Sequence, residues 1–490
     1  MRPPRWHRYW LPAAFIVLVL LPTAPAVGIA TAMLAAGALA GARFVLRHRR
    51  ASTAGHDAAV LGTDSRGRTV LLTDHELSAH GLILGASGAG KTTTLITILS
   101  DQIRRGRPVV AIDMKGSPSF ARELADAAAA TGSPVRVWTL DGGAYWNPLA
   151  HGNATELKDK LMSTERFTEP HYMRAAERYV QTVLQVLAHV SGARPPTLAE
   201  VVELMDPRRL ATGLRNVDRP LRERTQDYLA GLTADQLSAV RGLQTRLAVL
   251  TESHVGAFLS PPSDRDAPTI DLREALSVPH VVVFSLNSSK YGKLASQIGT
   301  LVVQDLVAAS GDRLTETARG RRLEPALIAI DEFSALGSDH VAALLARGRE
   351  PRTPVLVATQ ELADLERASA GFRDQVLGVT AVKIVHRQDV PASAQTVAQM
   401  AGTEEVWAET RRLGGLVFGG YDTGRGTRRL TERFIVHPNE IKTLRTGEAV
   451  VISKLGGGRP RTVRVASPHQ GAPNRDAARR DARGRDGPSL

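Results

Sequence analysis

One glycine-rich segment constrains the fold of this chain more than any other: Leu82 to Leu95, "LILGASGAGKTTTL". It has the spacing G-x-x-x-x-G-K-T, with an apolar, strand-like run before it and a helix with an apolar stripe after it. Glycines in such a loop allow positive φ angles, which aim successive N–H groups at one anion, and the helix N-terminus adds partial positive charge. The segment therefore predicts an α/β fold with a phosphate-binding loop.

This loop assigns a first set of functional residues. Lys91 is expected to contact the β- and γ-phosphates of ATP, and the Thr92 hydroxyl is expected to ligate Mg²⁺. The residues predicted to bind ATP are Gly85, Ala86, Ser87, Gly88, Ala89, Gly90, Lys91, Thr92 and Thr93.

A second apolar segment supplies acidic residues suited to hydrolysis. "ALIAIDEFSAL" reads as a buried strand that ends in Asp331 and Glu332, at the carboxyl end where open α/β sheets place their ligands. Asp331 is predicted to act on Mg²⁺ through its second coordination sphere, and Glu332 to polarise the attacking water. A third strand, "PVLVATQ", ends in Gln360, whose amide is expected to sense the γ-phosphate or hold the water.

Charge is unevenly distributed along the 490 residues. The net charge is +13, but residues 1–50 contribute seven arginines and no acid, and residues 459–490 contribute eight arginines against three aspartates. The intervening residues are nearly neutral, with 47 basic and 46 acidic side chains. Bulk charge therefore gives no DNA-binding signal for the core. The chain has no cysteine, which excludes disulfides and cysteine-bound metals.

The N-terminal segment has the composition of a membrane anchor. From Trp10 to Leu46 the only charged residue is Arg43, and one crossing needs about 20 apolar residues. Pro22 and Pro25 lie where a turn would fall, so a helical hairpin is predicted, with a single crossing as the alternative. Arginines flank both ends, which predicts a multi-pass protein of the cell membrane with a cytoplasmic ATPase domain.

Apolar strands alternate with helices through most of the remaining sequence, the pattern of a doubly wound, mainly parallel sheet. Between "WNPLA" and "TIDLREAL" the pattern is helical only, which predicts an all-α insertion, and the segment from about Gly456 is predicted to be disordered. The predicted parts are a membrane hairpin (1–50), a P-loop NTPase domain in two sections (51–154 and 269–455), the all-α insertion (155–268) and a basic, disordered tail (456–490).

The chain resembles a family known from conjugative DNA transfer. "HGLILGASGAGKTTT", "AIDMKGS", "WNPLA", "LIAIDEFSALG" and "VLVATQE", in this order, are similar to the motifs of type IV coupling proteins of the TraG/TraD kind, within the FtsK–HerA superfamily. The resemblance covers most of residues 75–455. It departs from the family pattern at Met114, where proline is frequent, and in the near absence of a periplasmic loop between the two predicted membrane helices.

The resemblance implies a RecA-like motor that assembles as a homohexamer and moves DNA. Its implied partners are DNA, a relaxase or other secretion substrate, components of a type IV secretion channel, and the membrane. It also implies an arginine finger acting on a neighbouring subunit, for which Arg349 is the best match and Arg347 the next. Lys115 is a further candidate for phosphate or DNA contact, although its sequence context favours a solvated loop lysine.

Three functions remain open at this point. The first is ATP-driven DNA translocation in conjugation. The second is an ATPase that drives protein export or processes DNA without transferring it. The third is an ATP-binding docking platform, which Glu332 argues against because a protein that only binds ATP needs no such carboxylate. An ABC transporter ATPase is excluded, since no L-S-G-G-Q motif lies between the two nucleotide motifs.

Overall fold

Short apolar runs that are buried on both faces form the centre of a twelve-stranded mixed sheet. The computed structural model describes residues 58–467 except 165, 166, 168, 193, 263, 265, 417, 418, 456 and 457. Seven neighbouring strands are parallel, as continuous apolar runs favour. In spatial order they are β12 (Val382–Val385), β3 (Gly81–Leu84), β11 (Val355–Thr359), β10 (Leu327–Asp331), β4 (Val109–Asp113), β9 (Val281–Ser285) and β5 (Val135–Thr139).

Antiparallel pairs extend this parallel core at both ends. Beyond β12 the order continues through β15 (Glu448–Ser453), β16 (Arg461–Val465), β1 (Ala58–Asp64) and β2 (Thr69–Thr73), and β6 (Gly142–Gly143) pairs with β5. The sheet is thus mixed and not parallel throughout. Strand β16 lies in the segment that was predicted to be disordered, so that prediction is wrong for residues 461–465; residues 468–490 lie outside the described part.

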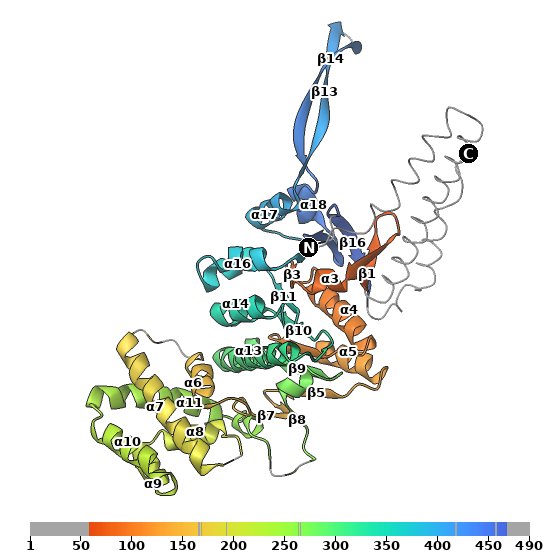
Figure 1. Ribbon diagram of the computed structural model, residues 1–490. Coiled ribbons are helices and arrows are strands. Elements are labelled where there is room, and N and C mark those ends of the chain that lie inside the picture. The colour runs from red at the N-terminus through yellow and green to blue at the C-terminus, as the bar shows by residue number, and fades with distance from the viewer. Residues whose placement is uncertain are drawn as a thin grey trace, which may run out of the picture. The chain divides into compact units, whose positions relative to one another are not determined.

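Helices cover both faces of the sheet, the doubly wound arrangement (Figure 1). One face packs against α3 (Asp74–Leu77), α4 (Lys91–Arg104) and α5 (Pro118–Ala129). The other face packs against α13 (Ser288–Ala318), α14 (Ser338–Arg347), α15 (Leu362–Ala368), α16 (Phe372–Val379), α17 (Pro391–Ala401) and α18 (Pro438–Thr443). These layers hold the carboxyl ends of the parallel strands in fixed positions, which is where the candidate site lies.

A run of helices with no strand between them follows the two-residue strand β7 (Tyr145–Trp146). It comprises α6 (Ala154–Met162), α7 (Pro170–Val190), α8 (Leu198–Leu204), α9 (Pro207–Gly213), α10 (Arg219–Ala230) and α11 (Ala234–Glu252). Strand β8 (Thr269–Ile270) and α12 (Leu272–Ala275) lead back to the sheet, and β8 pairs in parallel with β7.

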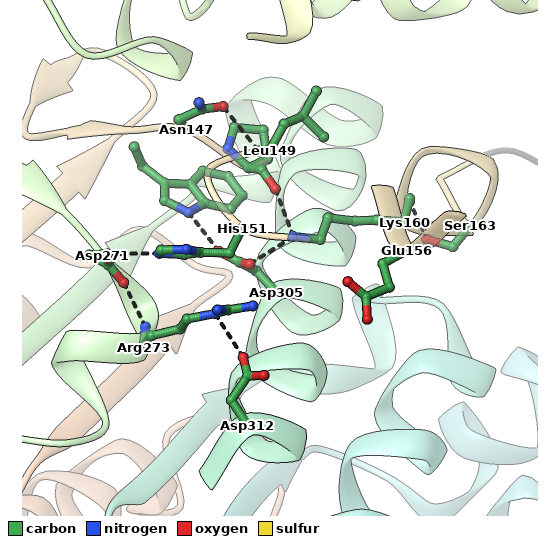
Figure 2. A network of polar contacts seen from close by, with 12 residues as sticks. Asn147, Leu149, His151, Glu156, Lys160, Ser163, Asp271, Arg273, Asp305 and Asp312 are labelled. Atoms are coloured by element: carbon green, nitrogen blue, oxygen red, sulfur yellow. Dashed lines mark hydrogen bonds and ion pairs between the residues drawn. The ribbon is translucent and has the colours of Figure 1, made fainter. Parts of the chain in front are cut away.

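A buried polar network ties the start of this helical run to α13 (Figure 2). Lys160 Nζ on α6 donates to Asp305 Oδ1 on α13 and to the Pro148 carbonyl, both at 2.7 Å. Trp146 Nε1 donates to the other Asp305 oxygen at 3.1 Å. The two charged side chains are 5% and 8% exposed, so the pair is desolvated, and each group has hydrogen-bond partners, as a buried charge requires.

A long two-stranded hairpin was not predicted. Strands β13 (Thr403–Leu416) and β14 (Gly419–Phe434) pair with each other and not with the main sheet (Figure 1). Trp407 and Leu430 are cross-strand partners near its base and are 66% and 44% exposed.

No helix in the described part of the chain is both long enough and apolar enough to cross a membrane. The longest, α13, has 31 residues, but Gly292 breaks its helical geometry and charged residues such as Asp305 and Arg313 lie along it. The predicted multi-pass membrane location is therefore wrong as far as these residues go. Residues 1–50, where the hairpin of membrane helices was predicted, lie outside the described residues.

Candidate active site

The phosphate-binding loop connects β3 to α4, as the sequence predicts. Gly88 and Gly90 have φ angles of +72° and +118°, a region that other residues rarely adopt. A Cβ atom on Gly85 would lie 2.6 Å from the Cβ of His386, and one on Gly90 would lie 3.2 Å from the Gly447 backbone. These glycines are therefore needed both for the loop conformation and for its close contact with the neighbouring segments.

Lys91, the first residue of α4, points back into this loop. Its ammonium donates to the carbonyl oxygens of Gly85 at 2.6 Å and Ala86 at 3.3 Å, and the residue is 3% exposed. An ammonium has three N–H donors, so one donor is left after these two contacts. Burial lowers the pKa of Lys91, and the nearby ammonium of Lys115 lowers it further.

The other loop residues differ in exposure. Ser87 and Gly88 are exposed at the tip, Ala86 and Ala89 are buried, and Thr93 is partly buried on the first turn of α4.

Thr92 and Asp331 meet although 239 positions separate them. The Thr92 hydroxyl donates to Asp331 Oδ2 at 3.1 Å, and the other oxygen of Asp331 accepts the backbone N–H of Glu332. Asp331 is 1% exposed, and burial raises its pKa despite the counteracting charge of Lys115. Hydroxyl and carboxylate oxygens are the ligands that Mg²⁺ prefers, so the donor set fits this ion.

Glu332 follows Asp331 in a strained conformation, with φ of +55°. Its Oε1 atom accepts a hydrogen bond from Gln360 Nε2 at 2.8 Å. The same atom forms an ion pair with Lys115 Nζ at 2.7 Å. The structure thus brings Gln360 to the Glu332 carboxylate, whereas the sequence predicted only that its amide would sense the γ-phosphate or hold the water. Positive φ at a residue other than glycine costs free energy and is concentrated at functional sites.

Lys115 was expected to be a solvated loop lysine. Its side chain is 39% exposed, but its ammonium also contacts Glu332, because β4 lies beside β10 in the sheet and Asp113 is in register with Asp331. Burial lowers the pKa of Lys115, but the hydrogen bond to Glu332 and the charge of Asp331 outweigh this and raise it.

Asp113 is a residue that sequence analysis did not single out. It is 1% exposed at the end of β4 and accepts the backbone N–H groups of Lys115 at 3.0 Å and Ser117 at 2.6 Å. Burial raises its pKa to about 6, and the neighbouring carboxylate of Asp331 contributes in the same direction. The sequence signal was present, since "AIDMKGS" also ends a strand in an aspartate.

His386 supports the phosphate loop from the other side. It is fully buried after β12, and its two ring nitrogens contact Thr94 Oγ1 at 2.9 Å and the Glu448 carbonyl at 2.8 Å. Burial lowers the pKa of His386 to about 4, so the ring is neutral at pH 7. The next residue, Arg387, accepts the Ala86 N–H through its carbonyl. The sequence alone gave neither His386 nor Arg387 a role at the site.

Arg349 does not lie at the site of its own chain. It is exposed between α14 and the start of β11, whereas Gln360 follows the end of β11, so the length of the strand, roughly 15 Å, separates them. The charge of Arg349 acts instead on His80, just before β3. Arg347 and Arg352 are also exposed on this segment.

Two protein families match parts of the chain by sequence. A family described as the TraM recognition site of TraD and TraG matches residues 325–446, and one described as the HerA-like helicase C-terminal region matches residues 59–132. No curated protein matches the chain by sequence.

Three solved structures share the fold. The unbound bacterial conjugative coupling protein TrwBΔN70 has a TM-score of 0.59 at 15% identity, over 83% of this chain and 88% of that one. TrwB in complex with ADP and Mg²⁺ has a TM-score of 0.56 at 15% identity, over 81% and 87%. VirB4 of Thermoanaerobacter pseudethanolicus has a TM-score of 0.54 at 14% identity, over 86% and 98%.

At these identities the structural matches establish a shared fold. The two family matches cover the phosphate-binding loop (59–132) and the strand that ends in Asp331 (325–446). The chain is therefore similar to TraD and TraG over residues 325–446 and to HerA-like helicases over residues 59–132.

Proposed function

We propose that this protein hydrolyses ATP and couples the hydrolysis to the movement of DNA in conjugative transfer or type IV secretion. The observation that carries the proposal is the meeting of Lys91 and Thr92 with Asp331 and Glu332 at the carboxyl ends of β3 and β10. Such a constellation joins a phosphate-binding loop to the carboxylates that hydrolysis requires.

Each residue has a role that its contacts support. The loop N–H groups and Lys91 would hold the phosphates, and Thr92 and Asp331 would position Mg²⁺, which neutralises phosphate charge when bound. Glu332 would accept the proton of the attacking water, and Gln360, which already donates to Glu332, would orient that water.

The DNA part of the proposal rests on the relatives. The TraG and TraD family match spans β10 to α18, and TrwB is described as a conjugative coupling protein. The substrate would be DNA, bound to a relaxase or another transferred protein, and the partners would include components of a secretion channel. The helical segment 155–268 is a candidate for recognising that substrate.

We further propose that the active form is a ring of several copies, six by resemblance to the family. The position of Arg349 is consistent with this arrangement, because an arginine at the edge opposite its own site could reach a γ-phosphate only in another subunit. A guanidinium at the neighbour's γ-phosphate would stabilise the charge that develops in the transition state.

ATP hydrolysis by the full chain should be measured with Mg²⁺ in three parallel reactions, without nucleic acid, with single-stranded DNA and with duplex DNA. We expect hydrolysis that at least one form of DNA stimulates and that Lys91→Ala abolishes. Hydrolysis indifferent to both forms would favour protein export instead. No hydrolysis in any reaction would refute the proposal.

A further inference from the structure

The carboxylate of Glu332 is held by two donors at one oxygen. Lys115 Nζ lies 2.7 Å from Oε1 and Gln360 Nε2 lies 2.8 Å from the same atom. A carboxylate that accepts a charge-assisted hydrogen bond is stabilised in its ionised form and is less ready to accept a proton. In this arrangement Lys115 opposes the role that the proposed hydrolysis gives to Glu332.

The backbone that carries Lys115 is fixed. Asp113 accepts two N–H groups of the turn, at Lys115 and Ser117. Gly116 has φ of +68°, and a Cβ atom there would lie 2.6 Å from the Asn287 backbone. The N–H of Leu286 donates to the Asp113 carbonyl, which joins the turn to the segment after β9. Any movement of the ammonium must therefore come from the side chain.

That side chain is able to move. It is 39% exposed, in contrast to the 13% of its partner Glu332, and its four-carbon stem is flexible. Its ammonium also lies close enough to Lys91 to lower the pKa of that group. Lys115 and Lys91 therefore approach the same region, the one in which the phosphate loop would hold the γ-phosphate.

We propose that Lys115 senses the γ-phosphate by exchanging partners: it holds Glu332 when no γ-phosphate is present and contacts the γ-phosphate when ATP is bound, which frees Glu332 to accept the proton of water. This inference rests on the proposed ATPase function. ADP has no γ-phosphate, so Lys115 returns to Glu332 once the cleaved phosphate has left. The exchange replaces a singly charged carboxylate with a more highly charged phosphate oxygen, which a point charge such as an ammonium favours.

Nucleotide affinity tests this inference without relying on turnover. Binding of ADP and of a non-hydrolysable ATP analogue to the full chain with Mg²⁺ should be measured by calorimetry. Lys115→Met should weaken binding of the analogue by about 10-fold or more, the usual size of a hydrogen bond between charged groups, and leave ADP binding within about 2-fold. Lys115→Arg, which keeps the charge, should retain most of the difference between the two nucleotides.

Lys290→Met is the matched control. Lys290 also pairs with a carboxylate, that of Asp141 at 3.4 Å, on an exposed surface with no proposed role. This variant should bind both nucleotides as the wild type does. Equal weakening of ADP and analogue binding in Lys115→Met, or no change in either, would overturn the inference.

The exchange of partners makes a second prediction that a merely structural ion pair does not. Glu332→Gln removes the carboxylate that competes for Lys115, so it should tighten binding of the analogue when Lys115 is present and not in the Lys115→Met background. The same effect in both backgrounds would refute the exchange while leaving the proposed function intact. A wild-type chain that bound neither nucleotide would refute both.

Discussion

Two lysine–carboxylate pairs in this protein have the same length and opposite surroundings. Lys160 and Asp305 lie 2.7 Å apart at the start of the helical run, with side chains only 5% and 8% exposed. Lys115 and Glu332 also lie 2.7 Å apart, but Lys115 is 39% exposed and Glu332 has a strained backbone. The Pro148 carbonyl accepts a hydrogen bond from Lys160 and the Trp146 indole donates one to Asp305, so both charged groups have a further partner inside the protein.

The different exposure of the two pairs suggests different roles: the buried pair stabilises the fold, and the partly exposed pair is able to take part in nucleotide chemistry. A buried ion pair whose hydrogen bonds are all made is costly to break, because either charge left alone is desolvated. A partly exposed ion pair contributes little free energy, so little is lost when water or a more highly charged group replaces one of its members. We therefore expect substitutions at the first pair to affect stability and those around the second to affect nucleotide chemistry.

The largest effect is expected at Arg349, the proposed arginine finger, which lies outside the site of its own chain. Arg349→Ala should lower the ATP turnover rate by 10³-fold or more, the magnitude typical of an arginine finger, while ATP binding is retained. Arg347→Ala serves as the matched control. A loss of turnover in Arg347→Ala alone would transfer the role to that residue.

Mixing variants tests whether Arg349 acts between subunits. A mixture of Arg349→Ala with Lys91→Ala should recover part of the turnover, because some interfaces then join an intact loop to an intact arginine. Two inactive proteins that stay inactive in demonstrably mixed assemblies would contradict action on a neighbour.

Breaking the buried pair should cost stability and not catalysis. Lys160→Met leaves the Asp305 carboxylate desolvated without its counterion, and the free energy of unfolding should fall by about 3–5 kcal/mol. Lys158→Met on the same helix is the control, since Lys158 pairs with the largely exposed Asp159. Chemical denaturation of both variants measures the difference in the free energy of unfolding. Equal values would show that the buried pair contributes no more to stability than the exposed one.

Glu332→Gln should bind ATP at least as tightly as the wild type and slow turnover by about 10²-fold, because an amide cannot accept the proton of water. Lys91→Ala should instead weaken binding and turnover together, since the lysine contacts phosphate in the ground state and the transition state alike. Normal turnover by Glu332→Gln would place the base at another residue.

The smallest effect is a dependence of stability on pH. Burial lowers the pKa of His80 to about 4. The neutral, buried histidine therefore contributes fully to the free energy of unfolding above the unfolded pKa of about 6.5, and this contribution is lost as the pH falls toward 4. Between pH 7 and pH 5 this histidine should cost about 2 kcal/mol of folding free energy. His80→Asn suits the positive φ of 62° and should reduce the loss of stability between pH 7 and pH 5 by about this amount. A further loss should remain, because burial also lowers the pKa of His386 to about 4.

Local sequence patterns predicted the parts of the site that lie within one segment. The strand, loop and helix around Lys91 and the strand that ends in Asp331 were assigned correctly as elements, because glycine spacing and apolar runs act over a few residues. The sequence also indicated that most of the large sheet is parallel.

Contacts that depend on the order of strands could not be predicted in this way. Lys115 reaches Glu332 only because β4 lies beside β10, and His386 supports the loop only because β12 lies beside β3. The hairpin of β13 and β14 was missed because its sequence is polar, with few apolar residues to alternate. Strand β16 was missed because "RTVRV" follows a glycine-rich stretch and gains its burial from β1 and β15.

The most direct test is thermal unfolding of the full chain and of two variants, with and without ATP and Mg²⁺. It asks whether Lys160 stabilises the fold while Lys91 binds the nucleotide. A nucleotide at 100 times its dissociation constant stabilises the folded state by about 2.7 kcal/mol. We predict that Lys160→Met melts at a lower temperature yet retains the rise on nucleotide addition, and that Lys91→Ala melts near the wild type without nucleotide but loses the rise. A nucleotide-induced rise that survives in Lys91→Ala and disappears in Lys160→Met would contradict the account.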